Sequence, residues 1–123
     1  MEKFTFKKSE RLSQEKLIQE LFDKGSSFYL YPFKVVFLPN ETPINQVMAS
    51  VPKSIFKRAV DRNTIKRRIR EGYRLNKTRL LPDKFFSIAY IYTAKEILPS
   101  AFIHQKIVLS FDKLITKNEG KKV

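Results

Sequence analysis

Cationic side chains are concentrated in one part of this sequence. Between Lys53 and Arg79 the chain holds 11 lysines and arginines and two acidic residues, Asp61 and Glu71. Successive residues of an α-helix are about 100° apart around its axis, so one group of polar side chains would share an arc of roughly 100°. Its five members are Asn63, Lys66, Arg67, Arg70 and Arg74, and Arg62 lies beside them, about 40° from Lys66. Arginine forks match the oxygens of phosphate groups in bidentate geometry, and this arc therefore has the chemistry of a phosphate-binding surface.

Outside residues 53–79 the balance of basic and acidic residues is ordinary, so this segment accounts for most of the net charge of the chain. The 123 residues include 25 Lys and Arg against 12 Asp and Glu, which gives a net charge of +13. Such a charge favours a polyanionic partner: nucleic acid, an anionic membrane surface or an acidic protein. A solvated helix face usually mixes the two signs. Like charges crowded on one arc cost stability unless a polyanion neutralises them, so the pattern favours nucleic-acid binding.

Residue types that catalyse reactions are scarce. The single histidine, His104, falls among core positions of a predicted helix, and the acidic residues are scattered singly, with no tight pair suited to holding two metal ions. The chain has no cysteine and three glycines, which excludes thiolate metal sites, disulfides and a glycine-rich phosphate loop. We therefore expect no catalytic residue and no metal ligand on this chain.

The sequence also predicts where the chain works. No apolar run approaches the ~20 residues that span a bilayer. The first eight residues lack the apolar segment of a signal peptide, and the absence of cysteine suits a reducing compartment. We expect a soluble, cytoplasmic, basic protein.

Apolar periodicity predicts six elements in the order α-β-β-α-β-α. We expect a helix that is capped by Ser13 and stopped by Gly25, a helix over residues 59–76, and a last helix capped by Ser100. Strands are expected at residues 33–38, 46–51 and 85–93, with an extra short strand at 4–6 and a break near 81–83. Residues 1–117 would form one α/β sandwich domain, and residues 118–123 a disordered basic tail.

Side-chain patterns predict which faces of these elements are buried. In the helix at 59–76, Ile65, Ile69 and Tyr73 share an arc that would anchor it to a sheet. In the first predicted strand, alternation puts Phe33, Val35 and Phe37 on one face, and Lys34, Val36 and Leu38 on the other. An aromatic cluster at residues 28–33 leads into this strand. Exposed aromatics beside cations can stack on unpaired bases, but we expect most of these rings to be core.

The basic helix carries a recognisable motif. The ten residues from Arg62 to Glu71, preceded by Ala59-Val60, resemble the signature of the bacterial ribonuclease P protein subunit, which reads roughly A-V-x-R-N-x-x-K-R-x-x-R-E. The agreement of spacing and identity covers about a dozen positions, and the wider resemblance covers about residues 9 to 117. It implies an α+β fold, a single α-β-β-β-α-β-α sandwich with a left-handed β-α-β crossover, like domain 2 of ribosomal protein S5; that hand is rare.

The resemblance also implies a function. The family protein assembles with a large catalytic RNA that removes the 5′ leader from precursor tRNA by hydrolysis. The active site lies in the RNA, the Mg²⁺ is held mainly by the RNA, and the protein alone is inactive. The implied partners are the catalytic RNA and precursor tRNA, without DNA or membrane, and the protein would be a monomer in a 1:1 ribonucleoprotein.

Two groups of site residues follow from the motif and the resemblance. The expected RNA-binding group is Lys53, Lys57, Arg58, Arg62, Asn63, Lys66, Arg67, Arg70 and Arg74. The family's leader-binding cleft lies between the first helix and the sheet, and the matching positions here are Ile18, Phe22, Lys34 and Val36.

This chain departs from the family pattern at several of these positions. Thr64 replaces the second arginine of the usual R-N-R, which removes one phosphate contact. Ile18 stands where an aromatic is frequent, and Lys34 and Val36 replace apolar and aromatic cleft residues. We therefore expect leader contacts to depend more on charge and less on stacking. Lys57 and Arg58 would extend the RNA-binding edge.

Two other functions fit parts of the sequence. A non-enzymatic RNA binder of ribosomal type would have the same composition, and only the motif separates it from the first hypothesis. A helix-turn-helix DNA-binding protein would use the helix at 59–76 for recognition. No short helix is expected before Ala59, which counts against this third reading.

Overall fold

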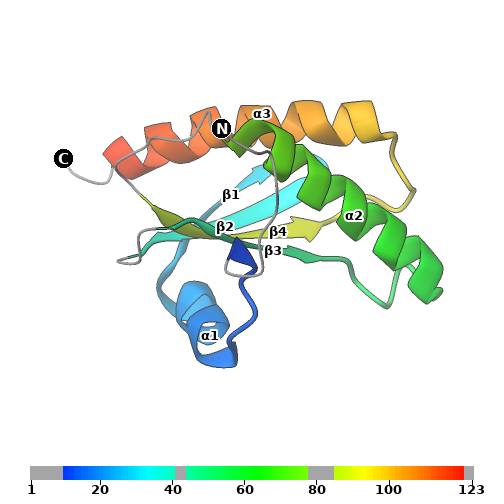
Figure 1. The fold of residues 1–123 in the computed structure, drawn as a ribbon, viewed down its shortest axis with the longest axis horizontal. Helices are drawn as coiled ribbons and strands as arrows, with labels where there is room; N and C mark the ends of the chain where they lie inside the picture. The colour runs from blue at the N-terminus through cyan, green and yellow to red at the C-terminus, as the bar shows by residue number, and fades with distance from the viewer. Residues whose placement is uncertain (1–9, 41–43, 78–84, 121–123) are drawn as a thin grey trace, which may run out of the picture.

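The computed structural model describes residues 10–40, 44–77 and 85–120, and Figure 1 shows its fold. Within these ranges, three helices and four strands follow one another in the order α-β-β-β-α-β-α. They are α1 (Glu15–Lys24), β1 (Ser26–Leu30), β2 (Phe33–Pro39), β3 (Gln46–Ser50), α2 (Ala59–Asn76), β4 (Phe86–Tyr92) and α3 (Ser100–Gly120). The fold is α+β, with the element order that the family resemblance implied.

The four strands form one sheet in the order β1-β2-β4-β3. The β1–β2 and β2–β4 pairs are antiparallel, whereas β3 and β4 are parallel. Parallel strands need a crossover connection, and α2 lies within it, between β3 and β4. The expected β-α-β unit is therefore present; its left hand stays a prediction.

The helices lie on both faces of the sheet (Figure 1), and each face has its own hydrophobic cluster. The larger cluster joins α2 and α3 to the face of β2 that carries Phe33, Val35 and Phe37. The smaller one places Leu21 of α1 against Val36 and Ala89 on the opposite face. The alternation predicted for β2 is confirmed, because Lys34 is exposed on the face that α1 covers only in part.

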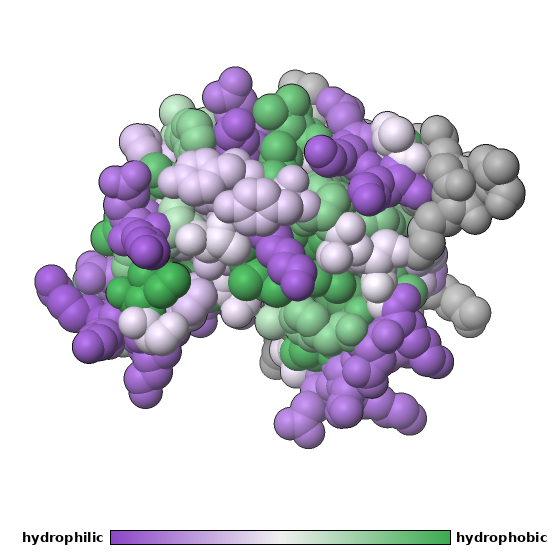
Figure 2. All heavy atoms as spheres, turned by 180° about the vertical axis from the view of Figure 1, so that it is seen from behind, coloured by the Kyte–Doolittle hydropathy of each residue, from purple (hydrophilic) through white to green (hydrophobic). Residues whose placement is uncertain are grey.

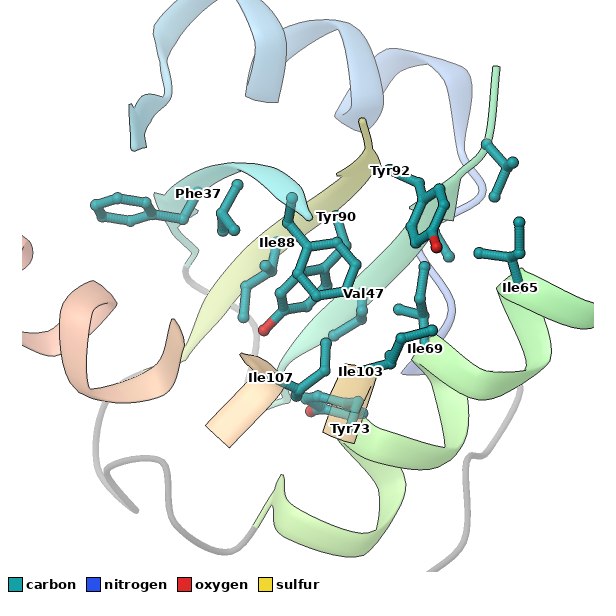
Figure 3. Packing of buried hydrophobic residues seen from close by; sticks show 14 of the residues in the cluster. Phe37, Val47, Ile65, Ile69, Tyr73, Ile88, Tyr90, Tyr92, Ile103 and Ile107 are labelled. Atoms are coloured by element: carbon teal, nitrogen blue, oxygen red, sulfur yellow. The ribbon is translucent and has the colours of Figure 1, made fainter. Parts of the chain in front are cut away.

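Figure 3 shows the larger cluster from close by. Ile65, Ile69 and Tyr73 point from α2 toward the sheet, and they share one buried cluster with Tyr90 and Ile107. Gly72 lets α2 approach α3 closely: a Cβ there would lie 3.0 Å from His104 Cδ2 and 3.1 Å from Ile107 Cγ1. The α2 anchoring residues predicted from the sequence are confirmed as buried.

The element boundaries agree closely with the sequence. The helix at Ala59–Asn76 has the predicted limits, and β2, β3 and β4 end within one residue of theirs. The sequence reading missed β1, whose residues Ser-Ser-Phe-Tyr-Leu include no β-branched side chain. Only the family resemblance implied three strands between the first two helices, and it gave no residues for the additional one. The strand expected at 4–6 and the break near 81–83 lie outside the described residues.

The predicted helix caps need correction. The first helix begins at Glu15 with Gln14 as N-cap, because the Leu12 N–H donates to the Val47 carbonyl (3.0 Å) and holds the preceding chain extended. Gly25 does end this helix, as predicted. The Ile103 N–H donates to the Pro99 carbonyl (3.1 Å), which makes Pro99, rather than Ser100, the cap of α3.

The last helix is longer than the sequence indicated. The backbone of α3 is helical as far as Gly120, although we expected a disordered tail from residue 118. Lysine and glutamate are good helix formers, and no glycine or proline follows Pro99 until Gly120. The remainder of the expected tail, residues 121–123, lies outside the described residues.

Candidate nucleic-acid interface

One face of α2 is buried and the other carries cations. Ile65, Ile69 and Tyr73 are almost completely buried (Figure 3). Asn63, Arg67 and Arg70 are exposed on the same helix, and Lys66 and Arg74 are half-buried. The anchored helix α2 therefore carries five of the predicted RNA-binding side chains on its solvent-facing side.

The cationic surface continues into the segment before α2. Lys53, Lys57 and Arg58 are exposed there, and Arg58 occupies the N-cap position of the helix. Arg62 donates through Nη1 to the carbonyl oxygens of Phe56 (2.8 Å) and Lys57 (3.0 Å). It therefore fastens this segment to the first turn of α2, and its guanidinium has a structural partner as well as a place on the cationic surface.

Two neighbouring side chains on α2 have structural contacts. Arg68 donates through Nη1 to the Leu98 carbonyl (2.7 Å) and ties α2 to the loop before α3. Thr64, at the position where the family usually has arginine, donates its hydroxyl to the Val60 carbonyl one turn earlier (2.9 Å). Neither residue belongs to the predicted RNA-binding group.

The C-terminal half of α2 contributes to a basic pocket that the sequence analysis missed. Its volume is about 310 Å³, and its lining residues are Arg11, Arg67, Arg70, Glu71 and Arg74. Partial burial, followed by repulsion from the charge of Arg11, lowers the pKa of Arg70. Four arginines and one glutamate form a concave, mainly cationic surface, and arginine guanidinium groups pair well with phosphate oxygens.

The position of Arg11 is fixed by its neighbours in the chain. Arg11 forms a parallel β-bridge with Val47 at the edge of the sheet. The preceding residue, Glu10, is buried and accepts hydrogen bonds from Lys77 Nζ at 2.9 and 3.1 Å. Nothing in the spacing of the sequence connects Arg11 with Arg70, and only the tertiary fold brings them together.

The structure brings three of the four residues predicted to line the leader cleft to the surface. Phe22 of α1 is exposed, Ile18 is half-buried, and Lys34 of β2 is exposed on the face of the sheet that α1 covers. Val36, by contrast, is only 5% exposed, because it packs with Leu21 beneath α1. The prediction that Val36 contacts a ligand is therefore corrected: Val36 supports the cleft from below.

A measurable pocket lies on the other flank of α1. Its volume is about 340 Å³, and it is lined by Leu17, Glu20, Leu38, Pro39, Asn40, Gln46 and Ser87. None of the four predicted cleft residues is among them. Around the axis of α1, Leu17 and Glu20 point to one side of the central Leu21, and Ile18 and Phe22 to the other. The predicted cleft is thus an open flank of α1 and not this pocket.

Potential metal-binding side chains are dispersed in the described residues. Among them, no three His, Cys, Asp or Glu side chains come together as a metal site would require. His104 is half-buried against Gly72, and its Nε2 has no hydrogen-bond partner.

No helix within the described residues is long and apolar enough to cross a membrane. Residues 51–58, before α2, contain no helix, so the helix-turn-helix arrangement is not present.

Comparison with known proteins decides the family. The family model described as Ribonuclease P matches residues 6–115, which is most of the chain. The chain belongs to the ribonuclease P protein family. Members of this family are the protein subunit of the ribonucleoprotein endonuclease that processes the 5′ end of tRNA, and RNA binding is the role that fits this subunit. The ribosomal-type alternative is therefore set aside.

Relatives and solved structures agree with this assignment. The chain is similar to the ribonuclease P protein component of Porphyromonas gingivalis, with 37% identity over 103 residues that cover 76% of this chain and 74% of the relative. The protein component of Petrotoga mobilis is 40% identical over 90 residues, covering 73% and 70%.

Solved ribonuclease P proteins share the fold. The structure from Thermotoga maritima matches with a TM-score of 0.74 and 26% identity, over 85% of this chain and 96% of that one. A structure from Staphylococcus aureus matches with a TM-score of 0.70 and 28% identity, over 88% and 96%.

Proposed function

We propose that this ribonuclease P protein uses two surfaces for two RNAs. The cationic surface, made of the nine predicted RNA-binding residues together with Arg11, binds phosphates of the catalytic RNA subunit. The open flank of α1, made of Ile18, Phe22 and Lys34, binds the single-stranded leader of precursor tRNA. The observation that carries the proposal is the division of the molecule by its sheet: α2 lies on one face, whereas Lys34 is exposed on the face that carries α1.

The chemistry of leader removal is assigned to the RNA in this proposal. Hydrolysis of a phosphodiester needs groups that activate water and stabilise developing charge. The acidic residues of this sequence are scattered singly and it has one histidine, so it offers no pair of such groups for that task. We propose that the RNA mainly holds the Mg²⁺. The protein would act as a monomer, in a 1:1 complex with the RNA, in the cytoplasm.

The first surface is tested by assembly with the catalytic RNA. Replacing Arg67 and Arg70 with alanine should weaken assembly by up to a few kcal/mol, because each charged hydrogen bond contributes about 1.5–3. The dependence of log K on log[salt] should become less steep by about two, since two phosphate contacts no longer release counterions. Lys95→Ala with Lys117→Ala removes the same charge from exposed positions outside α2 and should leave assembly almost unchanged. Equal losses in the two double variants would refute a specific role for α2.

The second surface is tested with substrate pairs. Lys34→Glu should raise the Kd of the holoenzyme for precursor tRNA, because the reversed charge repels leader phosphates, and should leave the Kd for mature tRNA unchanged. Lys16→Glu makes the same charge change on the solvent side of α1 and serves as the matched control. Equal effects of Lys34→Glu on both tRNAs would mean that Lys34 does not contact the leader.

A further inference from the structure

Two exposed tyrosines lie beyond the proposed leader cleft, and neither surface described above uses them. Tyr29 of β1 is 58% exposed, and Tyr31, in the turn between β1 and β2, is 43% exposed. The other three tyrosines, Tyr73, Tyr90 and Tyr92, are buried in the core. Figure 2 shows pale aromatic rings beside one another on the molecular surface, next to hydrophobic and hydrophilic side chains.

The first tyrosine adjoins the proposed cleft directly. Tyr29 lies opposite Lys34 in the antiparallel register of β1 and β2, so both side chains project from the same face of the sheet. The Tyr29 hydroxyl is 3.2 Å from Thr93 Oγ1, in a hydrogen bond across the end of the sheet. The ring is therefore held in place while more than half of its surface stays open to solvent.

The second tyrosine extends this surface around the end of the sheet. The Tyr31 ring packs edge-on against Phe102 of α3, with 6.4 Å between ring centroids. Lys106 Nζ lies 5.3 Å from the centroid of the same Phe102 ring. Exposed aromatic rings thus have a cation at each end, Lys34 on one side and Lys106 on the other.

This composition selects a ligand class. Unpaired bases stack on aromatic rings without sequence preference, and their phosphates need cations nearby. Both tyrosines are pre-positioned by the contacts above, so little side-chain freedom would be lost on binding. We propose that Tyr29 and Tyr31 form a stacking platform for unpaired leader nucleotides that extend past the cleft, with Lys34 and Lys106 facing their phosphates. This platform rests on the proposed function, because it continues the leader path from Lys34.

Leader length tests the platform. The experiment measures the Kd of the holoenzyme for precursor tRNAs that carry either a leader just long enough to reach Lys34 or a longer one. The double variant Tyr29→Ala, Tyr31→Ala should lose at least about fivefold in affinity for the long leader, since stacking contributes ~1–3 kcal/mol per base. Its affinity for the short leader and for mature tRNA should stay unchanged.

Conservative variants separate stacking from folding. Tyr29→Phe with Tyr31→Phe keeps both rings and should restore long-leader affinity, although the Tyr29–Thr93 hydrogen bond is lost. Leu109→Ala truncates another exposed apolar side chain, two turns beyond Phe102 on α3, and should change neither Kd. Loss of affinity in the phenylalanine variant equal to that in the alanine variant would overturn stacking.

The outcomes distinguish this inference from the proposed function. If Lys34→Glu weakens binding of short leaders while the alanine variant leaves the long leader unaffected, the cleft stands and the platform fails. If Lys34→Glu has no leader-dependent effect, the cleft itself fails, and the platform fails with it. If the alanine variant instead changes the sedimentation of the free protein, the tyrosines form a protein–protein contact and the proposal is overturned.

Discussion

Individual arginines on α2 have different roles, although their side chains are chemically identical. Arg62 and Arg68 donate to backbone carbonyls. Arg62 holds the segment before α2 against the helix, and Arg68 holds the loop before α3. Arg67 and Arg70 are exposed and line the basic pocket. A substitution at each type of position should therefore change a different measurable quantity.

Arg62→Ala should lower the free energy of unfolding by about 1–3 kcal/mol, because hydrogen bonds from a charged donor to two carbonyls are lost. Arg67→Ala should change it by less than about 0.5 kcal/mol, as expected of an exposed surface residue. Urea denaturation of the isolated variants measures both values. If the two variants are equally stable, the contacts of Arg62 with Phe56 and Lys57 do not stabilise the segment before α2.

Sequence reasoning located side chains well where one element decides their position. The helical arc of α2 and the alternation of β2 were both predicted, because each follows from the geometry of a single helix or strand. The sequence did not predict that Arg11 lines the basic pocket, and it predicted Val36 to be accessible although the side chain is buried. Both positions are decided by packing between elements. The accessible surface of β2 was decided by where α1 lies, and the sequence period of β2 contains no information about α1.

The connection between α1 and β1 depends on a single glycine. Gly25 ends α1 and donates its N–H to the Leu21 carbonyl (2.8 Å). Its backbone is extended, with φ −72° and ψ 161°, so the conformation itself does not require glycine. The surroundings do require it: a Cβ at residue 25 would collide with the carbonyl oxygens of Leu21 and Phe37, the latter at 2.9 Å.

Gly25→Ala should therefore destabilise the protein by about 1–3 kcal/mol, the cost typical of forcing an extra carbon into a packed site. Ser26→Ala, the adjacent substitution at a half-buried position, is the matched control and should cost less. Thermal unfolding followed by circular dichroism compares the two. A Gly25→Ala protein as stable as the wild type would show that α1 can move away from β2 at no cost.

Element boundaries were more predictable than element number. The long helix α2 and the apolar strands β2 and β4 have strong periodic or continuous patterns, which identify them without tertiary information. Strand β1 has five residues and begins with two serines, and its stability comes from pairing with β2 along its full length. The residues of a strand that is stabilised mainly by its partner do not, by themselves, predict that strand.

At the scale of the whole molecule, the tyrosines fall into two groups: three are buried in the core and two are exposed to solvent. Tyr90 is completely buried, and its hydroxyl pairs with Ser110 Oγ at 2.7 Å. Burial raises the pKa of Tyr90, and burial, followed by the charge of Glu10, raises that of Tyr73. The folded protein therefore keeps both phenols neutral at a pH at which an unfolded chain would ionise them.

This difference makes the core sensitive to alkali. In the unfolded chain a tyrosine ionises near pH 10. Its contribution to stability is therefore complete below about pH 10, and it is lost as the pH rises toward the higher folded pKa, by up to about 1.4 kcal/mol per pH unit for each phenol. Because lysines titrate in the same range, the wild type should be compared with Tyr90→Phe, in which one such phenol is absent.

The two stability curves should converge and cross as the pH rises. At pH 8 the Tyr90→Phe variant should be less stable by about 1 kcal/mol, because the hydrogen bond to Ser110 is lost. Above pH 10 the wild type should lose stability more steeply than the variant, since only its unfolded state releases the proton of Tyr90. Urea midpoints measured between pH 8 and pH 11.5 give the difference directly. A constant gap between the two proteins across this range would mean that Tyr90 reaches solvent and ionises in the folded state.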